Sequence, residues 1–232
     1  MKQNNNMGQC FNVQTTTLKN NCIAIYNYRD PTIKNILYKI KNDKDFIKST
    51  GAKSIITQLL NQIQRLYGSV NQEDIEPESP NGVESVKKTL IINVPSTSYW
   101  MSKKSFDHMH ILIKQIIKMY KTNTFNIING TKDSKNAFKI IHLSHAIIPR
   151  VVKSSQKKLT KEQRIYQSNN AYKLSWSFKK LLQDIDCNII ILDDIHTTGS
   201  TIRSCKQTVD DYLNKIHKTH IRIMSLTIAY EP

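Results

Sequence analysis

The sequence predicts an α/β protein with a mainly parallel sheet that is covered by helices on both faces. Short apolar runs suited to buried strands alternate along the chain with longer runs in which apolar residues recur at helical spacing. The clearest strand, at 189–192, is followed at once by two acids, a turn of small residues and another helical run. With 232 residues, the chain is long enough for one such domain with a full core.

The first part of the chain predicts an irregular arm followed by a strand and two helices. Residues 1–20 are polar, and 22–28 alternate as a strand does. Apolar positions then recur at helical spacing over 32–40 and 55–66. We expect these elements to form one hood-like region over 21–70.

Residues 71–88 mark a boundary, because acidic residues, Pro, Ser and Gly are concentrated there. We expect a linker or loop insertion at this point, followed by the core domain over 89–232. Within that domain the patterns predict strands at 90–94, 125–128, 140–148, 189–192 and 221–228, and helices at 106–120, up to Leu182, and up to about Lys215. The basic stretch 153–164 predicts an exposed loop or a frayed helix.

Charge and composition limit the function only loosely. The net charge of +16 is spread along the chain, which suits either a polyanionic partner or a solvated Lys-rich surface. The four cysteines form no C-x-x-C pair and suit reduced thiols in a cytoplasmic protein. The polar beginning of the chain does not resemble a signal peptide, and no apolar run is long enough to span a membrane.

The segment 189–201, IIILDDIHTTGST, carries the functional prediction. Its apolar run predicts a central strand, and ligands of open α/β sheets collect beyond the carboxyl ends of such strands. The small residues after the two acids lead into a helix, whose first N–H groups and dipole favour an anion. The pattern therefore predicts a phosphate held by the turn and sugar hydroxyls held by the carboxylates, although an ordinary capped turn is the structural alternative.

This segment resembles the signature of type I phosphoribosyltransferases, which bind 5-phosphoribosyl 1-pyrophosphate (PRPP). The resemblance implies that fold, and implies that Asp193 and Asp194 hold the ribose hydroxyls. The 5-phosphate would be bound by the turn His196, Thr197, Thr198, Gly199, Ser200 and Thr201. His196 occupies a variable position, so we expect a surface side chain without a catalytic role. Mg²⁺ is expected to bind through PRPP, with Asp193 as the candidate protein contact.

Among these proteins the chain is most similar to the ComF family, which is associated with competence. The early segment 24–45 resembles that family's first strand and helix, including a Lys at Lys41. The segment 93–109 resembles its pyrophosphate loop, which here supplies Pro95, Ser96, Thr97, Lys103 and Lys104. The chain departs from the pattern at Ser105, Asp107 and His108, where the family has Gly, Asn and Gln.

The segment 156–172 resembles the family's mobile loop over PRPP. The resemblance implies that Lys157 and Arg164 neutralise the leaving pyrophosphate, as catalytic residues. A solvated basic loop is the alternative. The family's N-terminal zinc-binding cysteine pairs are missing from this chain.

Three functions follow from the resemblance. The first is transfer of phosphoribosyl from PRPP to an unknown acceptor, with release of pyrophosphate. The second is non-catalytic binding of PRPP and single-stranded DNA in DNA uptake, for which the chain offers basic residues near the aromatic side chains Tyr99, Trp100, Tyr166 and Tyr172. The third is salvage of a purine or pyrimidine base.

Overall fold

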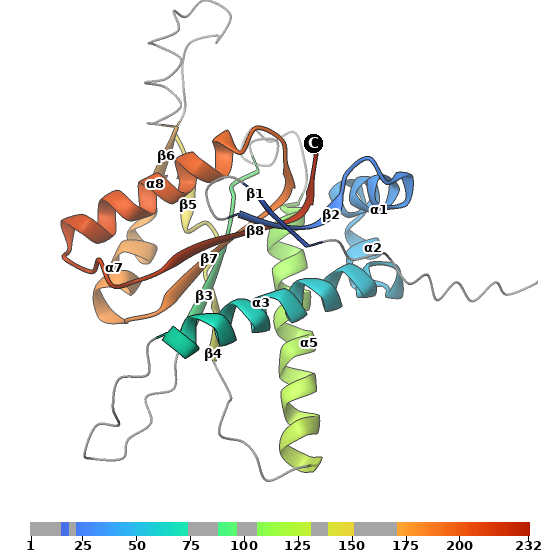
Figure 1. The fold of residues 1–232 in the computed structure, drawn as a ribbon, viewed down its shortest axis with the longest axis horizontal. Coiled ribbons are helices and arrows are strands. Elements are labelled where there is room, and N and C mark those ends of the chain that lie inside the picture. The colour runs from blue at the N-terminus through green and yellow to red at the C-terminus, as the bar shows by residue number, and fades with distance from the viewer. Residues whose placement is uncertain (1–14, 19–21, 74–87, 97–105, 131–138, 151–170) are drawn as a thin grey trace, which may run out of the picture.

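A six-stranded, mostly parallel sheet forms the centre of the molecule (Figure 1). The computed structural model describes residues 15–18, 22–73, 88–96, 106–130, 139–150 and 171–232. The strand order is β1-β2-β8-β7-β3-β4, and only β1 runs antiparallel to its neighbour. The strands are β1 (Thr16–Leu18), β2 (Cys22–Asn27), β3 (Lys88–Asn93), β4 (Lys139–His142), β7 (Asn188–His196) and β8 (Ile223–Tyr230).

A second, two-stranded sheet stands beside the main one. Its strands, β5 (Ile147–Pro149) and β6 (Tyr172–Leu174), pair antiparallel. Residues 151–170, between these two strands in the sequence, lie outside the described part of the chain.

Helices cover both faces of the main sheet, as the sequence predicts. One face is covered by α1 (Pro31–Asn42), α2 (Lys44–Lys48), the 3-10 turn η2 (Thr50–Ala52), α3 (Lys53–Glu73) and α5 (His108–Gly130). The other face is covered by α7 (Trp176–Asp184) and α8 (Ser200–Lys215). This α/β architecture confirms the coarse fold class.

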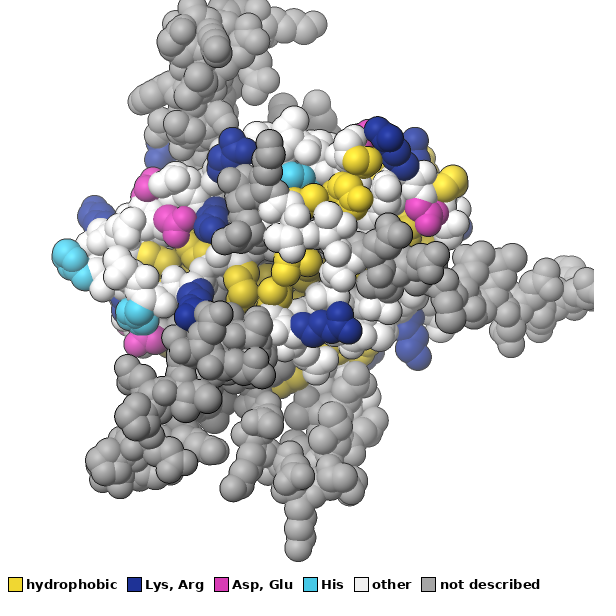
Figure 2. Space-filling view, viewed as in Figure 1, with side chains coloured by type: hydrophobic (Ala, Val, Ile, Leu, Met, Phe, Trp, Pro, Cys, Tyr) yellow, Lys and Arg dark blue, Asp and Glu magenta, His cyan; other side chains and the backbone are white. Residues whose placement is uncertain are grey.

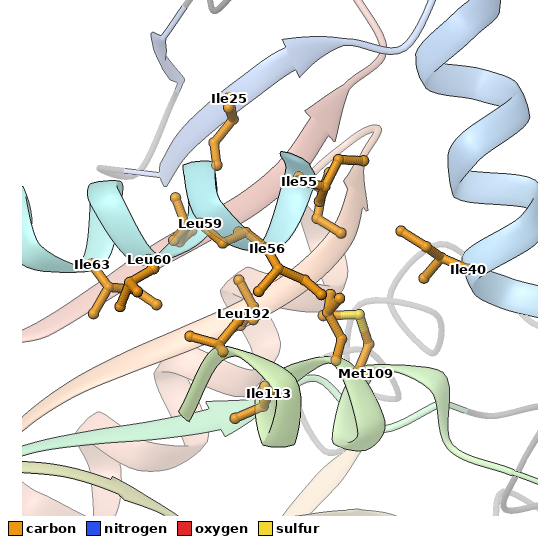
Figure 3. Close-up of a cluster of buried hydrophobic side chains, with 14 of the residues drawn as sticks. Ile25, Ile40, Ile55, Ile56, Leu59, Leu60, Ile63, Met109, Ile113 and Leu192 are labelled. Carbon is orange, nitrogen blue, oxygen red and sulfur yellow. The ribbon is translucent and has the colours of Figure 1, made fainter. Parts of the chain in front are cut away.

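Strand β7 shows why its run of apolar residues is continuous. Ile190 and Leu192 pack into the cluster under α3 and α5, and Figure 3 shows Leu192 between these two helices. Ile189 and Ile191 pack into the cluster under α7 and α8. Alternate side chains of a strand point to opposite faces. In a strand buried on both faces, each of these positions is therefore apolar.

The N-terminal elements share this core with the rest of the chain. Strand β2 pairs in parallel with β8, and Ile25 on β2 contributes to the same buried cluster as Ile113 on α5. Figure 3 shows side chains of α3 reaching into this cluster from the side of β2. The expected boundary at 71–88 falls largely on residues outside the described part of the chain, as do the arm up to residue 14 and the loop at 153–164.

Two of the predicted strands are wrong in detail. The strand expected over Phe125–Ile128 is helical, because α5 continues to Gly130. No Pro or Gly interrupts the chain between the start of α5 and Gly130, so the helix has no reason to end earlier. The single strand expected at 140–148 is divided into β4 and β5 by a turn in which His145 has a φ of 57°. The short strand β6 was not predicted.

None of the described helices combines the length and the apolar character that a membrane crossing requires.

Candidate functional site

The acid pair Asp193–Asp194 lies near the carboxyl end of β7, between β3 and β8. The helices α5 and α8 begin beside this edge, and in Figure 1 their first turns meet the ends of β3 and β7 near the top of α5. The pair therefore occupies the edge of the sheet at which α/β proteins bind ligands.

Asp194 is held by two side chains that approach the same oxygen. The Nζ atom of Lys41 lies 3.0 Å from Oδ2, and Nε2 of His108 lies 2.8 Å from it. Burial acts to raise the pKa of Asp194, but the hydrogen bond from His108 and the ammonium of Lys41 outweigh it, so the pKa is lowered. A carboxylate can only accept hydrogen bonds, so the Nε2 atom of His108 carries the proton.

Asp193 has the opposite titration behaviour. Burial and the neighbouring charge of Asp194 raise its pKa to about 7. Its Oδ1 accepts a hydrogen bond of 2.9 Å from the backbone N–H of Asp194. Among the described residues, neither Oδ2 of Asp193 nor Oδ1 of Asp194 has a protein hydrogen-bond partner. Each acid thus keeps one oxygen available to a ligand.

The turn 196–201 depends on one glycine and the side chain beneath it. Gly199 has a φ of 68°, which L-residues other than Gly adopt only at a cost. A Cβ atom at this position would also collide with the imidazole of His196. His196 is only 9% exposed, so the expectation of a surface histidine is wrong. The imidazole of His196 lies against Gly199 and so supports the turn.

The N-terminus of α8 is open for an anion. Asp30, Asp43 and Ser175 cap α1, α2 and α7 with side-chain hydrogen bonds, whereas Gly199 gives α8 no such cap. Thr197, Thr198, Ser200 and Thr201 are exposed around this turn, and the Thr198 hydroxyl donates to Ser200 Oγ at 3.1 Å. The Ser200 N–H in turn donates to Thr198 Oγ1 at 3.5 Å. N–H groups and hydroxyls gathered at a helix N-terminus are the usual elements of a phosphate site.

The hairpin β5-β6 borders this turn. Tyr172 on β6 lies beside Thr201, and β6 packs against α8. Burial raises the pKa of Tyr172, and Cys205 and Asp193 add to this effect. The chain that links β5 to β6 therefore begins and ends close to the acid pair and the turn.

The carboxylate of Asp107 is used by the protein itself. It accepts hydrogen bonds from the backbone N–H groups of Met109 and His110, at 3.1 Å and 3.2 Å, and from the Asn93 side chain at 3.2 Å. Asp107 therefore caps α5 instead of pointing at the ligand edge as an unpaired charge. The first N–H groups of α5 are occupied, in contrast to those of α8.

Only some of the other expected site residues belong to the described part of the chain. Pro95 and Ser96 follow β3 directly and so lie at the same edge as the acid pair. Thr97, Lys103 and Lys104 lie outside the described residues, and so do Lys157 and Arg164.

Three histidines gather at the carboxyl end of β4. The ring of His110 lies 5.0 Å from that of His142 and 6.2 Å from that of His145. Burial, His110, Lys114 and His145 lower the pKa of His142 to about 4. Burial and Lys114 also lower the pKa of His110. Near neutral pH these two imidazoles are uncharged. The described residues contain no group of His, Cys, Asp and Glu that could hold a metal ion.

Sequence reasoning missed the contacts of Lys41 and His108 with Asp194. It also missed the clustering of the three histidines. The H-x-H pattern at 108–110, at the start of a predicted helix, was the signal available for His108 and His110. Lys41 gave only a weak signal, because nothing in the sequence shows that α1 ends close to β7.

No known protein-family model matches this chain, and no curated protein matches it significantly.

Proposed function

We propose that this chain binds PRPP together with Mg²⁺, as a type I phosphoribosyltransferase-fold protein of the ComF kind. The observation that carries the proposal is the acid pair on β7 followed directly by the uncapped N-terminus of α8. The acids and the turn lie at one edge of the sheet, and Gly199 follows Asp193 by six residues, which suits a ribose and its 5-phosphate.

In this proposal the free oxygens of Asp193 and Asp194 receive the ribose hydroxyls. The N–H groups of the first turn of α8, with the hydroxyls of Thr198 and Ser200, receive the 5-phosphate. Gly199 keeps the backbone close to the phosphate, because a side chain there would displace the turn from His196.

The residues that are present fit Mg²⁺ only as a partner of the ligand. Mg²⁺ is commonly bound by one or two carboxylates together with substrate phosphates, and this edge of the sheet offers the acid pair. When bound, Mg²⁺ supplies positive charge to the pyrophosphate oxygens. Asp193 is the protein contact that we assign to it.

The accompanying activity is transfer of the phosphoribosyl group to an acceptor. A nucleophile on the acceptor forms a bond to the ribose anomeric carbon, and pyrophosphate leaves with the electron pair of the broken bond. The protein contributes positioning of the ribose and phosphate, and Lys157 and Arg164 are assigned to the leaving pyrophosphate. We place this activity in the cytoplasm, in keeping with the free thiols of Cys22, Cys187 and Cys205.

Calorimetric titration of PRPP with Mg²⁺ tests the proposal. Wild type should bind, and the double variant Asp193→Asn, Asp194→Asn should lose binding because amide groups put donors where acceptors are needed. The matched control is Asp210→Asn, Asp211→Asn, which makes the same change at another adjacent pair, on α8. Equal affinity of the wild type and the first double variant would contradict the site assignment.

Turnover is tested separately from binding. Consumption of PRPP over a panel of purine and pyrimidine bases would identify a salvage transferase. PRPP binding without consumption over this panel and other nucleophiles would favour a non-catalytic binder.

A second candidate function, binding of single-stranded DNA beside PRPP, has one specific observation in its favour. Trp176 is 76% exposed, and Nζ of Lys180 lies 5.5 Å from the centre of its ring. An exposed indole beside a cation can stack on a base. On the face in Figure 2, however, Lys and Arg side chains are dispersed instead of forming one track. Filter binding over a salt series, with Trp176→Ala and the exposed Tyr38→Ala as control, decides this candidate.

A further inference from the structure

Two side chains from distant parts of the chain meet on one oxygen of Asp194. Lys41 comes from the last turn of α1, and His108 from the first turn of α5. Their nitrogens lie 3.0 Å and 2.8 Å from Oδ2. An ionised carboxylate oxygen that accepts two charge-assisted or strong hydrogen bonds is fixed in orientation, so the plane of the carboxylate is set by α1 and α5.

The position of His108 suggests a purpose for this contact. The residue is 5% exposed, and its Nδ1 is buried without a hydrogen-bond partner. A buried imidazole nitrogen without a partner is costly to the folded protein. The ring is therefore oriented by its single hydrogen bond, the one to Asp194.

Lys41 provides the compensating charge. Among the described residues, the titratable groups that act on Asp194 are Lys41 from α1, His108 from α5 and Asp193 from β7 itself. The Lys41 side chain is 31% exposed and that of Asp194 is 14% exposed, so the pair is only partly screened by water.

We propose that Lys41 and His108 are positioning residues of the ligand site, which hold Oδ2 of Asp194 and so turn its Oδ1 toward a ligand hydroxyl. The identity of that ligand as PRPP rests on the proposed function above. Lys41 makes α1 part of the site, because the orientation of Asp194 depends on where α1 ends.

Calorimetric binding of PRPP with Mg²⁺ tests these roles. Lys41→Met should weaken binding by about tenfold or more, because Oδ2 of Asp194 loses one of the two contacts that fix the carboxylate. Lys41→Arg should stay within about threefold of wild type, since guanidinium supplies the same charge. Lys39→Met is the matched control, because Lys39 lies in the same turn of α1 but is exposed and contacts Phe46.

His108 is tested by a conservative and a disruptive change. His108→Gln, whose amide can donate to Oδ2, should bind within about threefold of wild type, whereas His108→Leu should bind about tenfold or more weakly. Thermal unfolding of each variant checks that it is folded, and Lys41→Gln replaces Lys41→Met if the latter is not. A merely structural role would lower the melting temperature and leave the affinity of Lys41→Met and His108→Leu unchanged, which would overturn the proposal.

A second measurement separates this proposal from the proposed function. If wild type does not bind PRPP, the proposed function fails, and the network is then tested without ligand. In ¹³C NMR of carboxyl-labelled Asp at one pH, the Asp194 signal, assigned from Asp194→Asn, should move in Lys41→Met and stay in place in Lys39→Met, because only the first variant removes a contact to Oδ2. An unchanged Asp194 signal in Lys41→Met would overturn the role of Lys41 whether or not the ligand binds.

Discussion

At the scale of single residues, two buried groups near the carboxyl edge respond to pH in opposite directions. Asp193 has a pKa raised to about 7, so the folded protein binds its proton more tightly than the unfolded chain does. His142 has a pKa lowered to about 4, so the folded protein binds that proton less tightly. As pH falls from neutral toward 4, protonation of Asp193 therefore raises the free energy of unfolding, and the shifted pKa of His142 lowers it.

The variants Asp193→Asn and His142→Gln should separate these two effects. Relative to wild type, Asp193→Asn should gain stability as pH rises from about 4 to 7, because wild type must then ionise a buried carboxyl. His142→Gln should gain relative to wild type as pH falls from about 6.5 to 4. Each difference should reach about 1–3 kcal/mol. Urea unfolding at several pH values measures the free energy of unfolding of each variant relative to wild type. If both variants gained stability in the same direction of pH, the assigned pKa directions would be contradicted.

Residues of the site could be predicted where the sequence places them together, and not otherwise. Asp193, Asp194 and Gly199 stand in one short segment whose strand, turn and helix are locally specified. Lys41 and His108 reach Asp194 only through the packing of α1 and α5 on the sheet, so no local pattern in the sequence shows that they contact it. The burial of His196 likewise depends on the closed turn above it.

At the scale of elements, the N-termini of α5 and α8 differ in how they are capped. Asp107 satisfies the N–H groups of Met109 and His110, and its other oxygen accepts from Asn93 at the end of β3. This ties α5 to the strand beside the acid pair. At the first turn of α8 the N-cap residue Gly199 provides no side-chain cap, and the Ser200 N–H donates to the Thr198 hydroxyl oxygen at 3.5 Å.

Substitution of Asp107 should therefore affect stability through the cap. Asp107→Ala should lower the free energy of unfolding by about 1–2 kcal/mol, because the cap and the tie to Asn93 are both lost. Asp107→Asn should retain most of the stability, since Asn is an equally good N-cap. Denaturant unfolding measures both, and an equal loss in the two variants would show that the charge, and not the cap, is what α5 requires.

Most elements were predictable because their periodicity agrees with their environment. The exceptions are instructive: 125–128 is apolar enough for a strand, yet it continues a long helix that nothing interrupts. Strands β5 and β6 have three residues each, too few for a pattern, and each depends on the other for its hydrogen bonds.

At the scale of the whole molecule, the region before the expected boundary and the region after it share a sheet. Strand β2 extends the sheet beyond β8, and α3 and α5 bury side chains in one cluster with it. Separation of the two regions would expose the edge of β8 and an apolar face of the sheet.

Cleavage of the chain within residues 74–87 should leave the molecule assembled. A protease site inserted there should give two fragments that elute together in size-exclusion chromatography and unfold in one thermal transition. Two transitions, or separate elution of the fragments, would show that the two regions fold as independent domains. The uncut protein with the same insertion is the control.

The pairing of β2 with β8 also has a consequence for the order of events during synthesis. The ribosome makes β2 before β3, β7 and every large helix, but β2 gains its parallel partner only when β8 has emerged. Until β8 emerges, the apolar strand β2 and the helices after it have no complete sheet to pack on. Contacts between residues far apart in the sequence therefore limit the rate of folding. The nascent chain should therefore depend most on chaperones in the interval before its last strand appears.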